Sequence, residues 1–472
     1  MNTPVKLVVI GAGPGGYAAA FLAADMGMQV TLIDKEENPG GVCVYRGCIP
    51  SKALLHAAKV LNESHEVENI GITFAKPVIN LDKLRAWKQS VVQRLTAGTG
   101  QLRKQRKIAH IQGMAKFINS STLQVVTVDG KTEQVTFDKA IIATGSRPVT
   151  IPTLPQSKNI LDSTTALDIE SIPDRLLVIG GGYIGLELST VYNALGSKVT
   201  VVEMMPQLLT GADRDLANVL IKRIESKFEK VMTSTKVLNV AETSAGFKVT
   251  FEDADKKQFT EDFGKILVSI GRKPNSENIG LENTKAKLTD RGFVKINGQL
   301  KTDDDNIYAI GDIAGNPMLA HKASHEGRTA VEAIAGHKVA FEPQAIPAVV
   351  FTDPEVAWCG LTELEAKDKG LEVNVVKFPW AASGRAITLD RVDGLTKLII
   401  DPKTERVLGM GIVGVGAGEL ISEGVLAIEM GALASDIKLS IHPHPTISET
   451  VMESAENFFG TATHFYRPRK TS

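Results

Sequence analysis

The chain begins with an apolar run, a helical stretch and a second apolar run. Residues 5–10 are mostly β-branched or leucine, which is typical of a buried parallel strand, and the alanine-rich stretch after them predicts a helix that ends near Met26. Residues 29–33 predict a second strand, which closes on Asp34. A strand, a helix and a strand in this order favour an α/β fold with a parallel sheet.

The turn between the first strand and its helix carries three spaced glycines, Gly11, Gly13 and Gly16. In this context their spacing is the fingerprint of a dinucleotide site. We expect the first glycine to form the tight turn, the second to let the backbone approach a pyrophosphate, and the third to let helix and strand pack closely. Asp34 would then hold a ribose hydroxyl. Glycines that serve packing alone are the alternative.

The same unit recurs in the middle of the chain. Residues 175–179 predict a strand, a glycine-rich turn and a helix follow, and residues 198–202 predict a strand that ends at Glu203. The interval from the first glycine to the acid equals that of the first unit, so the chain carries an internal repeat and two predicted dinucleotide sites. The glycines in the key places of the second turn are Gly180, Gly182 and Gly185.

Two of the three cysteines, Cys43 and Cys48, lie in the stretch 40–52 with four residues between them. Zinc sites show two such pairs, or one pair with histidines at fixed spacing, and neither pattern is present. Five residues of regular helix rise about 7.5 Å, whereas the Cα atoms of a disulfide lie roughly 4.4–6.8 Å apart. A bridge therefore needs a break in the helix, which Gly47 permits. We interpret the pair as a redox dithiol; two structural cysteines are the alternative.

The residues that follow the dithiol favour a thiolate at its second cysteine. From Ser51 onward the chain is rich in alanine and leucine and predicts a helix, with Pro50 near its first turn. The free backbone donors of a first turn stabilise a negative charge beside them. We therefore expect Cys48 to be the more acidic thiol.

Two nucleotide sites beside a dithiol indicate an electron relay between a nicotinamide, a flavin and a disulfide. The dithiol directly follows the first glycine unit, so we expect FAD at the first site and the nicotinamide at the second. Glu203 would accept a hydrogen bond from a free ribose 2′-hydroxyl and repel a 2′-phosphate, and no arginine follows it closely. This favours NAD over NADP; a solvated surface acid is the alternative interpretation of Glu203.

A further apolar strand, near residues 307–310, ends in Gly311-Asp312. An acid at the carboxyl end of a strand lies where α/β folds place ligand contacts. His321 and His325 follow on a predicted helix and share a face, but a metal site needs more ligands. We interpret both as surface or packing histidines and predict no metal site.

From about residue 346 the pattern changes to an antiparallel α+β module without a nucleotide fingerprint. Strand patterns at residues 397–400 and 407–413 flank a turn and predict a hairpin, and residues 418–430 predict an amphipathic helix. Cys359 is isolated in this module, and we interpret it as a small buried apolar residue.

The stretch 442–449 holds a candidate acid/base pair. His444 lies between two prolines that stiffen its backbone, and Glu449 could accept a proton from its imidazole and raise its basicity. Such a pair can take a proton from a thiol. Glu449 has an alternative role, because Thr446 and Glu449 fit a helix capping box.

Composition limits the class of protein. The chain has 472 residues, enough for about three domains, with 43% hydrophobic and 23% charged residues, as in soluble globular proteins. A net charge of −1 gives no support for nucleic-acid binding. We find no apolar run near 18 residues and no N-terminal targeting pattern, so we expect no membrane span and a cytoplasmic location.

Taken together, the motifs resemble the dihydrolipoamide dehydrogenases, a branch of the flavin disulfide reductases. The resemblance extends over essentially the whole chain, with the motifs in family order. The cysteine motif that runs into Ile49-Pro50-Ser51-Lys52 is highly specific to flavin disulfide reductases, and Glu203 favours the NAD-using lipoamide branch. Relatives often have Asn-Val where this chain has Tyr45-Arg46, and Glu where it has Asp34.

The resemblance implies roles for individual residues. Cys43 would exchange with the substrate dithiol, and Cys48 would lie against the flavin as a charge-transfer thiolate. His444 would be the acid/base, oriented by Glu449, and would reach the cysteines of the other subunit of a homodimer. Lys52 would lie near the reactive flavin edge, paired with Glu187. The implied FAD contacts are Asp34, Ala115, Asp312 and Ala320, and the implied NAD contacts are Glu203, Val237 and Gly271.

The resemblance also implies the architecture and the partners. We expect two Rossmann-like dinucleotide-binding domains, for FAD and NAD, plus a C-terminal α+β dimerisation domain. Residues 1–150 would begin the FAD domain, 151–275 would form the NAD domain, 276–345 would return to the FAD domain, and 346–472 would form the interface domain. The expected partners are the lipoyl domains of E2 acyltransferases of pyruvate and 2-oxoglutarate dehydrogenase complexes, and also the glycine-cleavage lipoyl protein.

Three alternatives stay open. A glutathione reductase should prefer NADPH, which Glu203 argues against. A mercuric ion reductase usually has an additional C-terminal cysteine pair, which residues 457–472 lack. The third is a flavin-binding scaffold or redox sensor without turnover, and the cysteine pair and His444 count against it.

Overall fold

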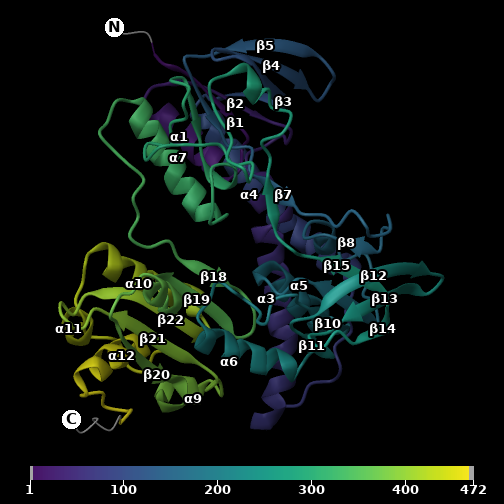
Figure 1. Cartoon of the computed structure of the whole chain (residues 1–472), viewed down its shortest axis with the longest axis vertical. Helices are drawn as coiled ribbons and strands as arrows, with labels where there is room; N and C mark the ends of the chain where they lie inside the picture. Colours follow the sequence, from purple (N-terminus) through teal and green to yellow (C-terminus); the bar gives the residue numbers. More distant parts are fainter. Residues whose placement is uncertain (1–3, 467–472) are drawn as a thin grey trace.

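The computed structural model describes residues 4–466 and arranges them around three main sheets (Figure 1). The first sheet has the strand order β17-β6-β1-β2-β3-β4-β5, with parallel pairing from β17 to β3 and antiparallel pairing beyond. A strand from the later part of the chain, β17, thus joins the sheet that the N-terminal residues form. The strands are β1 (Lys6–Ile10), β2 (Gln29–Asp34), β3 (Ala109–Asn119), β4 (Thr122–Thr127), β5 (Thr132–Thr136), β6 (Lys139–Ile142) and β17 (Ile307–Ala309).

Helices α1 (Pro14–Asp25) and α7 (Ala320–Ile334) lie side by side against this sheet, although most of the chain separates them (Figure 1). Their contact is close because small residues meet: a Cβ added at Gly15 would lie 2.8 Å from the Ala323 carbonyl oxygen. The apolar side chains between these helices and the strands form one buried cluster. The packing fixes where both ends of α1 lie relative to the sheet.

The dithiol region leads into a long helical hairpin. Helix α2 (Gly41–Arg46) is followed by α3 (Cys48–Glu66), a short 3₁₀ turn η1 (Val67–Ile70) and α4 (Leu81–Gln105). Asn80 caps α4, since its side chain accepts a hydrogen bond from the Lys83 N–H. The hairpin runs from the first sheet past the second (Figure 1).

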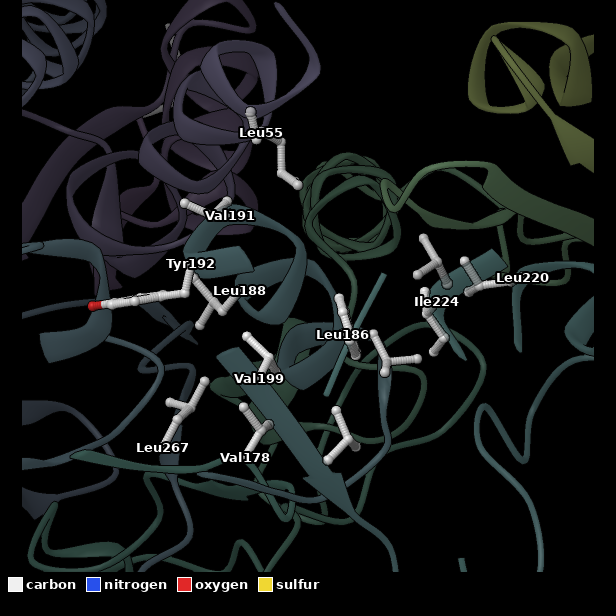
Figure 2. Packing of buried hydrophobic residues seen from close by; sticks show 14 of the residues in the cluster. Leu55, Val178, Leu186, Leu188, Val191, Tyr192, Val199, Leu220, Ile224 and Leu267 are labelled. Atoms are coloured by element: carbon white, nitrogen blue, oxygen red, sulfur yellow. The ribbon is translucent and has the colours of Figure 1, made fainter. Parts of the chain in front are cut away.

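The second main sheet is parallel, with the order β11-β10-β9-β15-β8, and its helix α5 covers a large buried apolar cluster. In Figure 2, side chains of α5 lie between Leu55 of α3 and Val178 and Val199 of the sheet. A separate antiparallel sheet, β12-β13-β14, packs nearby. The elements are β8 (Ile160–Leu161), η2 (Thr165–Leu167), β9 (Arg175–Ile179), α5 (Tyr183–Ala194), β10 (Lys198–Val202), α6 (Arg214–Glu225), β11 (Lys230–Met232), β12 (Lys236–Thr243), β13 (Gly246–Glu252), β14 (Gln258–Phe263) and β15 (Lys265–Val268).

Two short antiparallel strands, β7 (Ser146–Pro148) and β16 (Arg272–Pro274), pair where the chain passes between the first two sheets. The 3₁₀ turns η3 (Leu281–Asn283) and η4 (Gly311–Ile313) belong to the return segment. The pairing of β7 with β16 holds the outgoing and returning chains together.

The third sheet is antiparallel, with the order β18-β19-β22-β21-β20, and helices α10, α11 and α12 accompany it (Figure 1). The predicted hairpin is present as β21 and β22, and Cys359 is buried in this core, as the sequence indicated. The elements are β18 (Ala348–Val350), β19 (Glu355–Gly360), α8 (Glu363–Asp368), β20 (Asn374–Pro379), η5 (Trp380–Ala382), α9 (Gly384–Thr388), β21 (Leu395–Ile400), β22 (Val407–Gly414), α10 (Ala417–Glu429), α11 (Ala434–Leu439) and α12 (Glu449–Phe459).

The predicted α/β fold class is therefore confirmed, with one mixed sheet that is parallel from β17 to β3, one parallel sheet and a C-terminal α+β module. Strand β15 ends at Val268, and Gly271 adopts a φ of +126° outside it. None of the helices within residues 4–466 is both long and apolar enough to cross a bilayer.

Candidate active site

The two cysteines lie on either side of a helix break. Cys43 belongs to α2, and Cys48 is the first residue of α3. Gly47 between them adopts φ −147° and ψ −116°, and a Cβ at this position would lie 2.9 Å from the Val42 carbonyl oxygen. Glycine therefore allows the helix to break here. The expectation that no regular helix connects the two cysteines is confirmed.

The two thiols differ in acidity. A hydrogen bond between them, supported by the nearby cation of Lys52, lowers the pKa of Cys48 to about 7 although burial opposes the shift. The same hydrogen bond, together with burial, raises the pKa of Cys43 well above its usual range. The proton of the pair therefore stays on Cys43, and Cys48 is the group that becomes a thiolate near neutral pH. The direction agrees with the expectation that Cys48 is the more acidic thiol, but its main cause is the thiol–thiol hydrogen bond and not the start of the helix.

Lys52 is held one turn after Cys48 by a buried acid. Its Nζ lies 2.8 Å from Oε2 and 3.1 Å from Oε1 of Glu187 on α5. Oε1 of this carboxylate also accepts a hydrogen bond from the Phe351 N–H at 3.0 Å, and the Lys52 ammonium lies 4.6 Å from the centre of the Phe351 ring. The expected pairing of Lys52 with Glu187 is present, and it joins α3, α5 and the third sheet at the dithiol.

The first glycine turn is closed by Asp34. Its Oδ2 accepts a hydrogen bond from the Ala12 N–H at 2.7 Å, and its Oδ1 accepts one from the Glu36 N–H at 2.9 Å. The carboxylate at the end of β2 thus lies directly beside the turn that begins α1. Each oxygen retains lone pairs, so the group can also accept a hydrogen bond from a sugar hydroxyl.

The second glycine turn repeats this arrangement. Oε2 of Glu203 accepts a hydrogen bond from the Gly181 N–H at 2.7 Å, and Oε1 accepts one from the Met205 N–H at 2.8 Å. The internal repeat in the sequence therefore produces the same contacts twice, with the longer glutamate reaching the equivalent backbone group.

Both turns fit the pyrophosphate of a dinucleotide. Gly13 and Gly182 are the N-caps of α1 and α5, no side chain caps either helix, and no acid lies in either first turn. The N–H groups there are free for an anion. A Cβ at Gly13 or Gly182 would meet nothing within 4 Å, whereas one at Gly16 would lie 1.9 Å from the Gly11 carbonyl oxygen. The middle glycines thus face open space and the last glycines pack tightly, as the fingerprint predicts; Gly180 and Gly185 are similarly crowded.

Asp312 belongs to a polar network that the sequence did not reveal. Its Oδ2 accepts a hydrogen bond from the Ser146 hydroxyl. Arg272 in turn donates two hydrogen bonds to Ser146, from Nε to Oγ at 2.7 Å and from a terminal nitrogen to the carbonyl oxygen at 2.8 Å. Beside it, the Gly311 N–H donates to Oε2 of Glu326 at 2.6 Å, and Glu326 forms a buried ion pair with Lys322. The only sequence signal was the position of these residues at strand ends and on one helix face.

The remaining predicted contacts have no polar side chains. Ala115 is buried on β3, Ala320 is the first residue of α7, Val237 lies at a register shift of β12, and Gly271 lies between β15 and β16. Any contact that they make with a cofactor runs through the backbone or a small apolar surface.

The predicted acid/base pair is formed. Nδ1 of His444 lies 2.8 Å from Oε1 of Glu449, whose Oε2 accepts the Thr446 N–H at 2.8 Å. Only one of the two bonds of the predicted capping box is present, the one from the Thr446 N–H to Glu449. The other is missing, because α12 begins with Ser448 as N-cap and the Thr446 hydroxyl binds the Pro443 carbonyl oxygen and the Ser448 hydroxyl. Glu449 therefore combines histidine orientation with one backbone contact of the preceding turn.

His444 lies between α11 and α12 in the C-terminal module. Figure 1 shows these helices and the first sheet at opposite ends of the molecule. The side chain of His444 is 72% exposed, and the hydrogen bonds of the described residues do not join it to either thiol. The structure of one subunit thus brings Cys43, Cys48, Lys52 and Glu187 together but leaves His444 outside this cluster.

Comparisons with known proteins agree with this geometry. Residues 5–327 match the family model described as pyridine nucleotide-disulphide oxidoreductase, and residues 346–455 match the dimerisation domain of the same family. The dihydrolipoyl dehydrogenases of Vibrio cholerae and Haemophilus influenzae are 48% and 49% identical to the chain, each over 97% of this chain and 96% of the relative.

Solved structures are similar over nearly the whole chain. LpdA of Mycobacterium tuberculosis has a TM-score of 0.89 at 26% identity and covers 96% of this chain and 99% of its own. The HOCl-induced flavoprotein disulfide reductase RclA of Escherichia coli, solved with Cu(II), has a TM-score of 0.85 at 27% identity and covers 97% of this chain and 100% of its own. Since the family model spans more than half of the chain and the curated relatives match it end to end, the chain belongs to the pyridine nucleotide-disulphide oxidoreductases.

Proposed function

We propose that this chain is a dihydrolipoyl dehydrogenase, which oxidises protein-bound dihydrolipoamide to lipoamide and reduces NAD⁺. The unequal acidity of Cys43 and Cys48 beside the Lys52–Glu187 pair carries the proposal, because thiol–disulfide exchange needs one cysteine for the substrate and a second that leaves as a thiolate. The relatives with this name at 48% and 49% identity support the choice of substrate.

The first half-reaction takes place at the disulfide form of the pair. His444 removes a proton from one thiol of dihydrolipoamide, and the thiolate formed attacks Sγ of Cys43. The Cys43–Cys48 bond breaks, and Cys48 leaves as a thiolate, which its low pKa favours. The second thiol of the substrate then attacks the substrate sulfur that is bonded to Cys43. The bond to Cys43 breaks and Cys43 takes up the proton of that second thiol, so lipoamide is released and the substrate's two electrons remain on the cysteine pair.

The cofactors of the proposed enzyme are FAD and NAD. Bound FAD would take two electrons from the reduced cysteines and pass them as a hydride to NAD⁺. In this chain, Gly11, Gly13 and Gly16 with Asp34 would hold FAD, and Ala115, Asp312 and Ala320 would add contacts. Gly180, Gly182 and Gly185 with Glu203 would hold NAD, together with Val237 and Gly271.

The chain's own side chains prepare the site for this chemistry. Lys52 places a positive charge beside the Cys48 thiolate, and Glu187 keeps that ammonium in position from a nearly fully buried site. Glu203 favours NAD over NADP, because its carboxylate at the end of β10 would accept the 2′-hydroxyl and repel a 2′-phosphate.

The proposed active unit is a homodimer in which His444 serves the cysteines of the partner. The match to a dimerisation domain supports this arrangement, and so does the high exposure of His444 in the single subunit. Large apolar side chains of the same module are also exposed, namely Leu426, Met430, Leu439 and Ile441. A second copy would cover such surface.

The domain limits follow from the proposed roles. Residues 1–150 and 276–345 would form the FAD domain, 151–275 the NAD domain, and 346–472 the interface domain. Lipoyl domains of acyltransferase subunits, or the lipoyl protein of glycine cleavage, would be the partners. We keep the cytoplasm as the proposed location, because a working dithiol is maintained in a reducing compartment.

Anaerobic titration of the purified protein with dihydrolipoamide tests the proposal. We expect a flavin spectrum that gains a long-wavelength band from the Cys48 thiolate, and NADH formation when NAD⁺ is added. Cys43→Ser should retain FAD and the thiolate band but lose lipoamide turnover. A bound flavin that stays oxidised with dihydrolipoamide would refute the substrate, and full turnover by Cys43→Ser would refute the relay.

A further inference from the structure

A second histidine–glutamate pair lies beside the first. His442, two residues before His444, has its Nε2 at 2.8 Å from Oε1 of Glu423 on α10 and its Nδ1 at 2.9 Å from the Ser440 carbonyl oxygen at the end of α11. The side chain of His442 is only 8% exposed. Its partners belong to its own subunit, so this geometry exists without a second copy.

The two contacts fix the charge of the ring. A carbonyl oxygen and a carboxylate both accept hydrogen bonds, and a neutral imidazole carries only one N–H. Both contacts of His442 are hydrogen bonds only when both ring nitrogens carry protons. A carboxyl group is ordinarily a stronger acid than an imidazolium, so a proton shared between a carboxylate and an imidazole lies on the imidazole.

The electrostatics of the site point the same way. The hydrogen bond to Glu423 raises the pKa of His442 against the effect of burial, and the Ser440 carbonyl and the charge of Glu449 add to the increase. The groups that face His442 are thus Glu423 from α10, Glu449 from the start of α12 and the Ser440 carbonyl from the end of α11, with His444 on the same segment. Two carboxylates and a carbonyl favour the cation, and one neighbouring imidazole opposes it when protonated.

Within the described residues, the segment that carries His444 has few other contacts that hold its side chain in place. His444 makes one side-chain hydrogen bond, to Glu449, and is otherwise largely exposed. His442 ties the same segment to α10, a helix that packs against β19 and β22. The segment is therefore held from both sides, by Glu449 after His444 and by the His442–Glu423 pair before it.

We propose that His442 is a positioning residue for His444. The imidazole of His442 carries two protons at neutral pH and anchors the 440–446 segment to Glu423. The inference rests on the proposed function, since it concerns the thiol exchange assigned to His444. Loss of the His442 proton at high pH breaks one of the two anchoring hydrogen bonds. The anchor therefore weakens as pH rises through the pKa of His442, and dihydrolipoamide turnover falls with it.

Three variants test the role. His442→Gln removes the cation, Glu423→Gln keeps an acceptor oxygen but removes the charge, and Glu419→Gln is a matched control on the exposed side of α10, one turn earlier. We expect His442→Gln to lower dihydrolipoamide:NAD⁺ turnover about tenfold or more through misplacement of His444. NADH oxidation by ferricyanide, which bypasses the thiol exchange, should be unchanged, as should both activities of Glu419→Gln.

The pH profile and the histidine NMR signal separate positioning from mere stabilisation. In Glu423→Gln, the alkaline limb of the lipoamide reaction should move down by about one pH unit, because the cation loses its partner charge. With ¹³C-labelled histidine, the signal assigned through His442→Gln should remain that of an imidazolium through pH 7 in the parent and should titrate earlier in Glu423→Gln.

Equal losses in both assays, or an unmoved alkaline limb in Glu423→Gln, would overturn the positioning role. A parent signal that titrates like an exposed histidine would overturn the charge of the ring at neutral pH. A parent protein that does not oxidise dihydrolipoamide would overturn the proposed function, and with it the role of His442 in that reaction. The titration midpoint of the His442 NMR signal would still support or overturn the charge of the His442 ring, because that measurement does not depend on turnover.

Discussion

Lys52 on α3 and Glu187 on α5 form an ion pair across 135 residues of sequence, with 2.8 Å between Nζ and Oε2. The two residues act on the Cys48 thiol in opposite directions: the ammonium lowers the pKa of Cys48, and the carboxylate raises it. The pair thus sets the charge beside the dithiol. Substitution of each residue in turn tests its effect on the pKa of Cys48.

Lys52→Met should raise the pKa of Cys48 from about 7 by about one unit, because the stabilising cation is lost. Glu187→Gln should lower it, because the opposing negative charge is lost while the amide oxygen can still accept the Phe351 N–H. The pH dependence of the long-wavelength thiolate absorbance in the two-electron-reduced enzyme measures both. Shifts of the same sign in the two variants would contradict the opposed roles.

His444→Gln should slow dihydrolipoamide oxidation about 10²- to 10⁴-fold, the usual contribution of a general base. Burial opposes the ionisation of Glu449, yet hydrogen bonds from the Thr446 N–H and His444 hold the pKa of Glu449 below its usual range. The carboxylate is therefore charged through neutral pH, and Glu449→Gln should show a smaller loss, since an amide can still orient the ring. Stopped-flow reduction by dihydrolipoamide checks the losses, and unchanged NADH:ferricyanide activity is the control. Parallel losses in both reactions would remove His444 from its role.

Glu203→Arg should weaken NADH binding and relieve the exclusion of NADPH, because the repulsion of a 2′-phosphate is replaced by attraction. The substitution also removes the hydrogen bonds to the Gly181 and Met205 N–H groups, so Glu203→Gln, which keeps an acceptor oxygen, is the matched control for the turn. The ratio of kcat/KM for the two nucleotides measures the effect. An unchanged ratio in Glu203→Arg would contradict the assignment of this acid to the ribose.

Lys397→Met should destabilise the protein by about 3–5 kcal/mol at neutral pH, the usual cost of removing one member of a buried ion cluster. Lys397 is 1% exposed, and its Nζ lies within 2.9 Å of oxygens of Asp213, Asp215 and Glu363. The three acids could be mistaken for a cation site. The ammonium occupies their centre and joins the start of α6 to the third sheet.

The pH dependence of this cluster gives the prediction a second readout. Burial opposes the ionisation of Asp215, yet hydrogen bonds from Lys377 and Lys397 lower its pKa. A depressed carboxyl pKa contributes stability above the unfolded-state value, and this contribution is lost as pH falls through the folded-state value. The free energy of unfolding of the parent should therefore fall as the pH becomes acidic. In Lys397→Met it should fall less, because protonation relieves the repulsion between the carboxylates that have lost their ammonium partner. Urea unfolding between neutral and acidic pH measures both; identical pH slopes would contradict the cluster.

The local elements of this protein could be predicted because they depend on near neighbours in the chain. The glycine turns, the strands that precede them and the acids that end the next strands repeat at one interval, and the structure gives Asp34 and Glu203 the same backbone contacts. The break at Gly47 followed from helix geometry together with the short Cα separation that a disulfide requires. Where prediction failed locally, at Thr446, helix α12 begins further along the chain, with Ser448 as its N-cap and without a capping bond from the serine side chain.

The tertiary structure decided which distant residues meet. No periodicity or spacing relates Ser146 to Arg272 and Asp312, or His442 to Glu423, because each pair depends on how separate elements pack. The resemblance to known enzymes suggested the Lys52–Glu187 pair, but only the crossing of α3 and α5 brings the charges together. Sequence thus determined the turns, the dithiol and the fold class through local backbone geometry. Packing between elements determined the charges around Cys48 and His444, since electrostatic interactions depend on distance in space.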